Sequence, residues 1–274
     1  EIIMFERGPH VSFSHCSLPY HLSGIVESSE KLVLMTPESF QTKYNIEARV
    51  NQEVIKIDRE EKTVTVKNLE TDEEYTENYD VLVLSPGAKP FVPNFEGVDL
   101  PHVFTVRNVQ DIERLNQYVK NPGIRDIAVI GGGFIGVEVG ENLRLAGKEV
   151  TLVEHSPQIM APFDEDMAQI LHKEMVDRGI QLILGDGLER ITESQIELSS
   201  GKQVKAQAVV LAIGVRPETT LAKEAGLEVT TTKFPLGGNG RAISMDRTEG
   251  FVRLITTKED NVIVGAQVAG VNAS

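Results

Sequence analysis

The sequence predicts an α/β protein with two Rossmann-like dinucleotide-binding domains, of which the first is incomplete. Gly131, Gly133 and Gly136 form a G-x-G-x-x-G turn between an apolar strand and a helix. Strands alternate with helices around this turn, which is typical of parallel βαβ units in a doubly wound sheet. The opening stretch IIMFERG has the form of TLVEHS at residues 151–156, an apolar strand that ends in an acid. This repeated form indicates a second unit of the same kind.

Length, charge and cysteine content narrow the class of protein. The 274 residues leave room for about two domains of ordinary size. A net charge of -14 would repel nucleic acid and anionic membranes, so we expect neither as a partner. The single cysteine, Cys16, cannot form an internal disulfide, and no apolar run approaches the roughly 18 residues of a membrane span. We see no signal peptide and expect a cytoplasmic protein. The chain opens directly on a strand, so we also expect residues to be missing upstream.

The first third of the chain predicts one helix, several hairpins and a buried strand. Pro37 at a first helical position and Glu38 in the first turn indicate a helix that starts near Thr36. Apolar and polar residues alternate from residue 53 to 78, which predicts hairpins with the acidic ETDEE at a solvated tip. The apolar DVLVL at residues 80–84 predicts a buried strand.

The rest of the chain, up to residue 217, predicts a regular succession of helices and strands. Apolar residues at helical spacing and turn residues at the ends define each element. The expected elements are a helix over 109–121, a strand over 125–130, a helix after the glycine turn to residue 147, a strand over 149–156, a helix over 163–179, a strand over 180–185, a short antiparallel piece over 187–206 and a buried strand over 208–214.

Each glycine of the G-x-G-x-x-G turn has a physical role. Gly131 allows the tight turn, Gly133 lets a pyrophosphate approach the backbone, and Gly136 lets helix and strand pack closely. The phosphates would lie at the helix N-terminus, beside Phe134 and Ile135, where free N–H groups and the helix dipole favour negative charge. The turn therefore predicts a dinucleotide site.

The acid at the end of the next strand indicates which dinucleotide binds. Glu154 follows the turn by about 20 residues, at the position where an acid binds the adenosine ribose. His155 and Ser156 come next, and no Arg or Lys stands nearby to bind a 2′-phosphate. An acid accepts the free ribose hydroxyls and repels a phosphate, so the sequence predicts NAD, with NADH preferred over NADPH.

Two small-residue turns indicate a second, flat cofactor. Ser85, Pro86 and Gly87 end one apolar strand, and Gly214 ends another. Such turns let the backbone pass close to a ligand. Glu6 closes the opening strand as Glu154 closes its own, so these segments together predict an incomplete second dinucleotide site.

Several ordered motifs resemble those of one family. SFxxCxLPY, YDVLVLSPGAKP, VIGGGFIGVE and LAIGVRPE are similar to segments of the FAD-dependent pyridine nucleotide-disulfide oxidoreductases, over residues 1–232. CSLPY after the cysteine resembles the coenzyme A-disulfide reductases of the single-cysteine branch in particular. Residues 233–274 resemble the start of the interface domain of dihydrolipoamide dehydrogenases.

The resemblance implies three domains and two cofactors. These are a partial FAD-binding domain over residues 1–105, an NAD(P)-binding Rossmann domain over 106–232, and a partial α+β interface domain over 233–274. An interface domain implies a homodimer for the intact protein. The family's first glycine turn and its Gly-Asp segment are absent from this sequence, so we expect the chain as given to bind NADH better than FAD.

The resemblance also implies a redox role for Cys16. Electrons would pass from NADH through FAD to Cys16, which forms a mixed disulfide with coenzyme A; the substrate is a small disulfide or persulfide. The SLPY that follows predicts a helix beginning just after Cys16, and a helix N-terminus lowers the pKa of a thiol. The implied substrate contacts are Ser12, His15 (where the family has Asn) and Lys43. The implied FAD contacts are Glu6, Arg7, Val54, Ser85, Pro86, Gly87 and Gly214.

Other functions remain open on the sequence alone. Within the family they are a dihydrolipoamide dehydrogenase, which the missing second cysteine disfavours, and an NADH oxidase or peroxidase. A Cys–His hydrolase would use His15 or His21 as its base, but it would leave the dinucleotide motifs without a role. A non-catalytic NAD-binding fragment is the alternative from another class. The histidines show no metal-ligand spacing, so no metal site is predicted.

Overall fold

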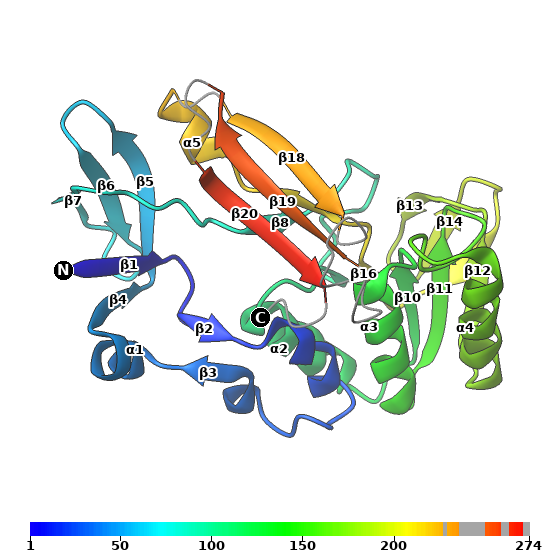
Figure 1. The fold of residues 1–274 in the computed structure, drawn as a ribbon. Coiled ribbons are helices and arrows are strands. Elements are labelled where there is room, and N and C mark those ends of the chain that lie inside the picture. The colour runs from blue at the N-terminus through cyan, green and yellow to red at the C-terminus, as the bar shows by residue number, and fades with distance from the viewer. Residues whose placement is uncertain (227–228, 236–249, 259–262, 271–274) are drawn as a thin grey trace. The chain divides into compact units, whose positions relative to one another are not determined.

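The structure is a computed structural model that describes residues 1–226, 229–235, 250–258 and 263–270 (Figure 1). The chain divides into two compact units. Unit 1 comprises residues 1–9, 45–88 and 217–274, and unit 2 comprises residues 10–44 and 89–216. The first unit is thus assembled from three separated stretches of the chain, and the second from two.

Unit 2 is built on a parallel five-stranded sheet, as the alternation of strands and helices predicts. The strand order is β12-β11-β10-β16-β9. Every neighbouring pair is parallel, and Ile127 of the central strand lies opposite Val150 on one side and Ala208 on the other. The strands are β9 (Val103–Phe104), β10 (Asp126–Ile130), β11 (Glu149–Glu154), β12 (Gln181–Leu184) and β16 (Ala208–Leu211).

Three helices accompany this sheet, and each confirms a predicted helix. They are α2 (Val109–Val119), α3 (Phe134–Leu145) and α4 (Glu165–Asp177). α3 packs on β10 and β11, and α4 packs on β12 (Figure 1). The Asn108 side chain accepts a hydrogen bond of 2.8 Å from the backbone N–H of Asp111, which satisfies a first-turn donor of α2.

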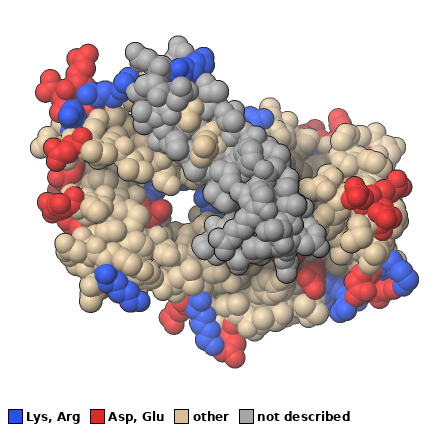
Figure 2. All heavy atoms as spheres, viewed as in Figure 1, with Lys and Arg blue, Asp and Glu red and all other residues tan. Residues whose placement is uncertain are grey.

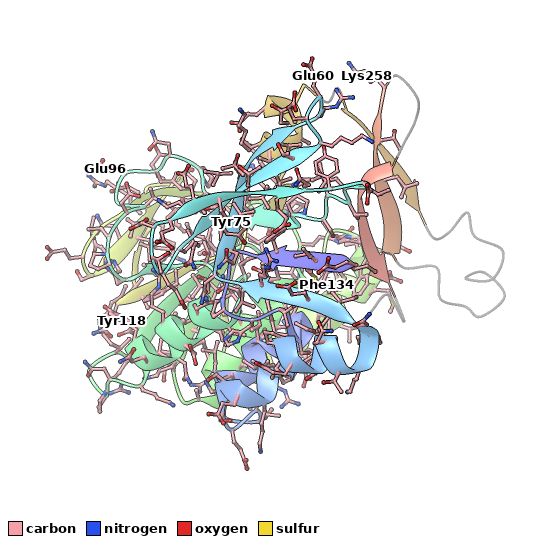
Figure 3. The ribbon with its side chains drawn as sticks, turned by 90° about the vertical axis from the view of Figure 1, so that its left-hand side faces the viewer. Glu60, Tyr75, Glu96, Tyr118, Phe134 and Lys258 are labelled. Carbon is pink, nitrogen blue, oxygen red and sulfur yellow. The ribbon has the colours of Figure 1, made fainter. Side chains whose placement is uncertain are left out.

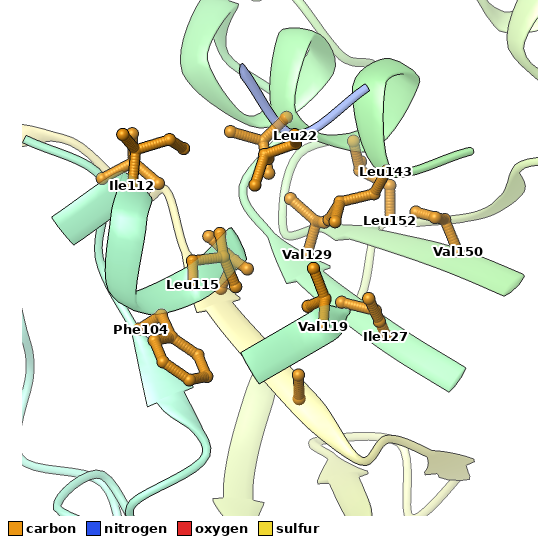
Figure 4. Close-up of a cluster of buried hydrophobic side chains, with 14 of the residues drawn as sticks. Leu22, Phe104, Ile112, Leu115, Val119, Ile127, Val129, Leu143, Val150 and Leu152 are labelled. Atoms are coloured by element: carbon orange, nitrogen blue, oxygen red, sulfur yellow. The ribbon is translucent and has the colours of Figure 1, made fainter. Parts of the chain in front are cut away.

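Both faces of the sheet are buried. Alternate side chains of each strand point to opposite faces, and each face is covered by other elements. On one face, Ile127 and Val129 of β10 pack with Leu115, Leu143 and other residues from α2, α3 and β11 (Figure 4). On the other face, side chains of β10 pack against an antiparallel sheet of β13 (Leu188–Ile191), β14 (Gln195–Leu198) and β15 (Gln203–Lys205). This antiparallel sheet confirms the short piece predicted over residues 187–206.

Residues 10–44 of unit 2 contain short elements around Cys16. β2 (Ser12–Phe13) pairs with β3 (Val33–Met35). Three leucines of this stretch belong to the same buried cluster as residues of α2 and α3: Leu18, Leu22 and Leu32. The helix expected near Thr36 is confirmed as α1 (Pro37–Tyr44).

The helix expected just after Cys16 is wrong. The segment instead forms two 3-10 turns, η1 (His15–Ser17) and η2 (Pro19–His21), and a third, η3 (Ser29–Leu32), follows. Each of the first two is closed by its own bond three residues back, Leu18 N–H to His15 O and Leu22 N–H to Pro19 O. Pro19 has no N–H to extend the first turn into a longer helix, so Cys16 lies inside a three-residue turn.

Unit 1 contains two small sheets and an antiparallel C-terminal sheet. β1 (Ile2–Glu6) and β4 (Ile46–Val50) form a parallel pair. β5 (Gln52–Asp58), β6 (Thr63–Asn68) and β7 (Glu74–Asn78) form the predicted hairpins, and the acidic stretch lies at the tip between β6 and β7. The C-terminal sheet is formed by β18 (Val229–Pro235), β19 (Gly250–Thr257) and β20 (Ile263–Gly270). The remaining elements are α5 (Thr220–Glu224) and, where the chain passes between units, the paired strands β8 (Ala88–Pro90) and β17 (Val215–Pro217).

Arg49 links the two small sheets of unit 1. Its guanidinium donates to Glu47 and Glu77, each at 2.7 Å, and to the hydroxyl of Tyr75 at 3.2 Å. Figure 3 labels Tyr75 on β7. The same guanidinium lies 5.5 Å from the ring centre of Phe5. The hydrogen bond to Glu47 leads the contributions that raise the pKa of Arg49 well above its usual value. β1, β4 and β7 are thereby connected through one side chain.

The buried strand expected over residues 80–84 is wrong. The segment forms no regular element and pairs with no strand among the described residues, and Val81 and Val83 are each 82% exposed. Leu82 and Leu84 pack on the cluster of Ile57, Val64 and Val66. One face of the segment is therefore covered while the other lacks a neighbour. A strand needs hydrogen-bonding partners along its edge, and β1 and β4 do not supply one here.

The surface of the described part mixes both signs of charge. On the face in Figure 2, acidic and basic side chains lie over both units without forming one continuous area of either sign. Among the described residues, no helix is long and apolar enough to cross a membrane. The same residues contain no group of three or more His, Cys, Asp or Glu side chains arranged to hold a metal ion.

Candidate functional site

The glycine turn of unit 2 joins β10 to α3 and is held from two sides. The Gly131 N–H donates to Val153 O at 2.8 Å, which ties the turn to the end of β11. The Met160 N–H donates to Gly132 O at 2.7 Å, so the loop after β11 closes over the turn. Gly131 has a φ of 108°, a conformation that glycine adopts readily and other residues rarely do.

Two of the three glycines leave no room for a side chain. A Cβ atom on Gly136 would lie 1.9 Å from the carbonyl oxygen of Gly131, and one on Gly131 would lie 2.4 Å from that of Ala212. These backbone contacts explain why helix and strand can pack so closely here. A Cβ on Gly133, by contrast, would meet no atom within 4 Å. The turn is therefore tightly packed at Gly131 and Gly136 and open at Gly133.

The open side coincides with the start of α3. Gly133 is the N-cap residue and offers no side-chain acceptor, so the first N–H groups of the helix lack partners within it. Phe134, which Figure 3 labels, and Ile135 are 57% and 38% exposed. The ring of Phe134 lies edge-on to Phe163, with 6.3 Å between the ring centres. Unpartnered N–H groups beside a surface that admits backbone approach fit a pyrophosphate.

Glu154 is fixed at the glycine turn by two backbone hydrogen bonds. Its Oε2 accepts from Gly132 N–H at 2.6 Å, and its Oε1 accepts from Ser156 N–H at 2.7 Å. A carboxylate has about four acceptor positions, so roughly two remain for ribose hydroxyls. No Arg or Lys in the described part forms an ion pair with Glu154. The arrangement fits a ribose that donates from its hydroxyls.

Cys16 is exposed, which excludes the interpretation that it is one more core side chain. It lies between His15 and Ser17 in η1, and the hydroxyls of Ser14 and Ser17 are 2.7 Å apart. The Nε2 atom of His15 lies 2.5 Å from the Nη1 atom of Arg107. The burial of the His15 ring against the protein, together with the charge of Arg107, lowers the pKa of His15.

His21 is a structural histidine. It is buried, and its two ring nitrogens lie 2.8 Å from Val26 O and 2.9 Å from the Asn116 amide nitrogen. The first contact requires a donor and the second an acceptor, which fits a neutral ring with its proton on Nδ1. With both nitrogens occupied, His21 cannot act as a base towards Cys16.

The residues that the resemblance assigns to FAD fall mostly in unit 1. Glu6 ends β1 and accepts from Gly8 N–H at 2.6 Å, and Arg7 forms an exposed ion pair of 3.4 Å with Glu53. Val54 lies on β5. Ser85, Pro86 and Gly87 follow the irregular segment over residues 80–84, and Gly87 has a φ of 72°. Gly214, with a φ of 108°, belongs to unit 2.

The predicted substrate contacts lie in unit 2 with Cys16. Ser12 lies on β2 opposite Met35, and His15 adjoins the cysteine. Lys43 lies in the last turn of α1, and no hydrogen bond joins it to residues 12–17 in the described part of the chain. His15 and Cys16 are therefore neighbours in the sequence, and no hydrogen bond among the described residues links Lys43 to them.

Two polar residues of the candidate site, Arg107 and Glu138, were not predicted from the sequence. Arg107 contacts His15 although 91 residues separate them, and no local pattern signals a contact of that kind. Glu138 lies on α3 one turn after the glycine turn, where burial and the nearby Glu141 raise its pKa. Its place in VIGGGFIGVE was a signal, because a carboxyl on the face of such a helix is close to the dinucleotide site.

The parallel sheet, the tight glycine turn and the strand-end acid define unit 2 as a Rossmann-type dinucleotide-binding fold. The sequence profile of the family described as pyridine nucleotide-disulphide oxidoreductase matches residues 1–236. The chain therefore belongs to the pyridine nucleotide-disulphide oxidoreductase family.

Several members of this family are similar to the chain over most of its length. An NADH oxidase of Methanocaldococcus jannaschii is 36% identical over 234 residues, which are 84% of this chain and 52% of the relative. A coenzyme A disulfide reductase of Staphylococcus aureus (strain JH9) is 33% identical over 85% of this chain and 53% of its own length. The crystal structure of reduced Bacillus anthracis CoADR-RHD matches with a TM-score of 0.82 and 32% identity, covering 100% of this chain and 67% of that one. The chain thus spans about half the length of the curated relatives it matches.

Proposed function

We propose that the intact protein reduces a small disulfide or persulfide, most simply coenzyme A disulfide, with electrons from NADH that pass through FAD to Cys16. The observation that carries this proposal is the exposure of the single cysteine, in the same unit as a glycine turn shaped for a dinucleotide. The likeness to a coenzyme A disulfide reductase supports the choice of substrate.

The chain's own residues supply binding and the sulfur nucleophile. The Cys16 thiolate attacks one sulfur of the disulfide; the S–S bond of the substrate breaks, a Cys16–substrate disulfide forms, and one thiolate leaves. Two further electrons and a proton release the second thiol and restore the Cys16 thiolate. FAD, when bound, supplies the two-electron transfer that links NADH to this sulfur. The overall step consumes one NADH and one proton for each disulfide and yields two thiols.

We propose that NADH is preferred over NADPH. Glu154 is held by Gly132 and Ser156 in a fixed position at the turn, so its negative charge would face a 2′-phosphate directly. The dinucleotide phosphates would lie at Gly133, Phe134, Ile135 and Gly136, with Gly131 shaping the turn. Binding of NADH and NADPH to the purified chain, measured by calorimetry, tests this preference: equal or tighter NADPH binding contradicts it.

The domain roles are part of the same proposal. Residues 1–105 would contribute to FAD binding through Glu6, Arg7, Val54, Ser85, Pro86 and Gly87, and Gly214 is the further FAD contact that the resemblance implies. Residues 106–232 would bind NAD(H), and residues 233–274 would form part of a homodimer interface in a cytoplasmic enzyme. Residues 236–249, 259–262 and 271–274 of that last segment lie outside the described residues.

The test compares Cys16→Ser with Ser17→Ala as a control in flavin-loaded enzyme. Cys16→Ser should still transfer electrons from NADH to the flavin, seen as bleaching of its visible absorbance, while coenzyme A disulfide reduction falls to background. Ser17→Ala should retain both reactions. Disulfide reduction by Cys16→Ser at the wild-type rate would end the proposal.

An NADH oxidase is the second candidate, because the archaeal NADH oxidase is the more identical of the two relatives described above. The two candidates share the dinucleotide site and differ in the electron acceptor. NADH consumption with oxygen alone, measured with and without coenzyme A disulfide, separates them. Rapid turnover with oxygen and none with the disulfide would favour the oxidase.

A further inference from the structure

The contact between Arg107 and His15 fixes the imidazole of the residue that precedes Cys16. Arg107 stands just before α2, where its backbone N–H donates to Asp111 Oδ2 at 3.0 Å. The His15 ring packs on Phe13 with 4.3 Å between ring centres. Phe13 in turn lies on β2 and packs against the buried core. Both partners of the contact are therefore anchored by elements of unit 2.

The chemistry of the two groups fixes the state of the imidazole. A guanidinium has only N–H donors and keeps its charge, so the Nε2 atom that lies 2.5 Å from it must accept. A ring that accepts at Nε2 is neutral and carries its proton on Nδ1. Protonation of Nε2 would break this hydrogen bond and set two cations side by side; burial first and then the charge of Arg107 lower the pKa of His15. Among the described residues, no hydrogen-bond partner lies at Nδ1.

We propose that Arg107 is a positioning residue that holds His15 in the neutral Nδ1–H form and so presents one uncharged hydrogen-bond donor to the substrate of Cys16. This inference rests on the proposed function. A single neutral N–H suits an uncharged acceptor, such as an amide carbonyl near the substrate sulfur. A histidinium would instead favour a carboxylate. Arg107 thereby selects disulfides that carry amides close to the sulfur atoms.

The first test examines the imidazole itself and needs no turnover. Nitrogen NMR of ¹⁵N-histidine-labelled protein, with His15 assigned through His15→Asn, should show a single Nδ1–H tautomer in the wild type. Arg107→Met should give a mixture of tautomers and move the titration of His15 to higher pH, while Arg107→Lys should restore most of the wild-type signal. An unchanged His15 signal in Arg107→Met would overturn the positioning role.

The second test compares two disulfides in flavin-loaded enzyme: pantethine, which carries amides, and hydroxyethyl disulfide, which carries none. Arg107→Met should raise KM for pantethine by about fivefold, as expected for one hydrogen bond, with kcat and the KM for hydroxyethyl disulfide within about twofold of wild type. An equal rise for both disulfides would overturn the selection of amides. If wild-type enzyme reduces neither disulfide, the proposed function fails and the substrate role fails with it, while the NMR result still decides the tautomer.

Discussion

The ends of β11 and β1 show the same local structure in two different surroundings. Glu154 ends β11 and accepts from the N–H two residues on, at 2.7 Å; Glu6 ends β1 and accepts from the N–H two residues on, at 2.6 Å. β11, however, lies between two parallel strands, whereas β1 pairs only with β4 in the described part of the chain. Glu154 also holds the glycine turn through Gly132. Local sequence therefore determines the hydrogen bond at the end of each strand, whereas the dinucleotide site also needs the neighbouring parallel strands.

The largest expected effect contrasts a buried position of unit 2 with an exposed position of unit 1. Leu152 on β11 is fully buried, while Val83 in the irregular segment over residues 80–84 of unit 1 is almost fully exposed. Leu152→Ala should lower the free energy of unfolding by about 2–5 kcal/mol, because it leaves a cavity in a packed core. Val83→Ala should stay within about 0.5 kcal/mol of wild type. Urea denaturation measures both; a cost at Val83 similar to that at Leu152 would contradict the exposure of residue 83.

The next effect separates packing from binding within the glycine turn. Gly136→Ala places a methyl group against the Gly131 carbonyl and should cost about 1–3 kcal/mol of stability. Gly133→Ala has open space and a φ of -79°, so it should unfold near the wild-type midpoint. NADH affinity should nevertheless fall in Gly133→Ala, because the methyl group occupies the surface proposed for the pyrophosphate. Stable Gly133→Ala protein with unchanged NADH affinity would contradict that placement.

The two strand-end acids allow a matched test of cofactor assignment. Glu154→Gln should weaken NADH binding by roughly 1.5–3 kcal/mol, the usual worth of a hydrogen bond to a charged group. Glu6→Gln should leave NADH binding unchanged and weaken only the binding of FAD. Calorimetry with each cofactor measures the four affinities. A loss of NADH affinity in Glu6→Gln as large as in Glu154→Gln would remove the distinction between the two regions.

The smallest expected effect is a pH dependence at His15. Its folded pKa is lowered by burial and by Arg107, so the unfolded chain binds a proton at a higher pH than the folded chain does. The neutral ring should therefore contribute fully above the unfolded pKa of about 6.5, and stability should fall as the pH drops below that value. Because His15 is only partly covered by the protein and keeps contact with solvent, we expect a slight effect. His15→Asn, compared with wild type by thermal melts at pH 5 and pH 8, should remove it; a wild type that gains stability over the variant in acid would reverse the sign.

Much of unit 2 could be predicted from the sequence because its helices, strands and glycine turn are each determined by residues close together in the sequence. The glycine spacing, the helical periodicity of α2 and the strand-end acid at Glu154 each act over short distances, and the structure places all of them as expected. The parallel order of β10, β11 and β12 follows from their helical connections. The family profile matches residues 1–236, a range that includes these motifs.

The errors arose where a local pattern needed a partner elsewhere in the chain. DVLVL has the composition of a buried strand, but burial depends on a neighbouring strand that residues 80–84 do not find. SLPY contains a helix-starting proline, yet the same proline divides the segment into two 3-10 turns. The contact between Arg107 and His15 joins α2's start to η1, and no sequence pattern over so long a separation could predict it.

The most direct test of the central claim is whether Cys16 exchanges with coenzyme A disulfide. Exchange needs no flavin, because the thiolate displaces one coenzyme A thiolate and retains the other half as a mixed disulfide. The sequence has one cysteine, so any disulfide adduct found by mass spectrometry lies on Cys16. We predict one coenzyme A per chain, formed faster than the adduct with glutathione disulfide at the same concentration. An unmodified chain, or equal rates with both disulfides, would contradict the account.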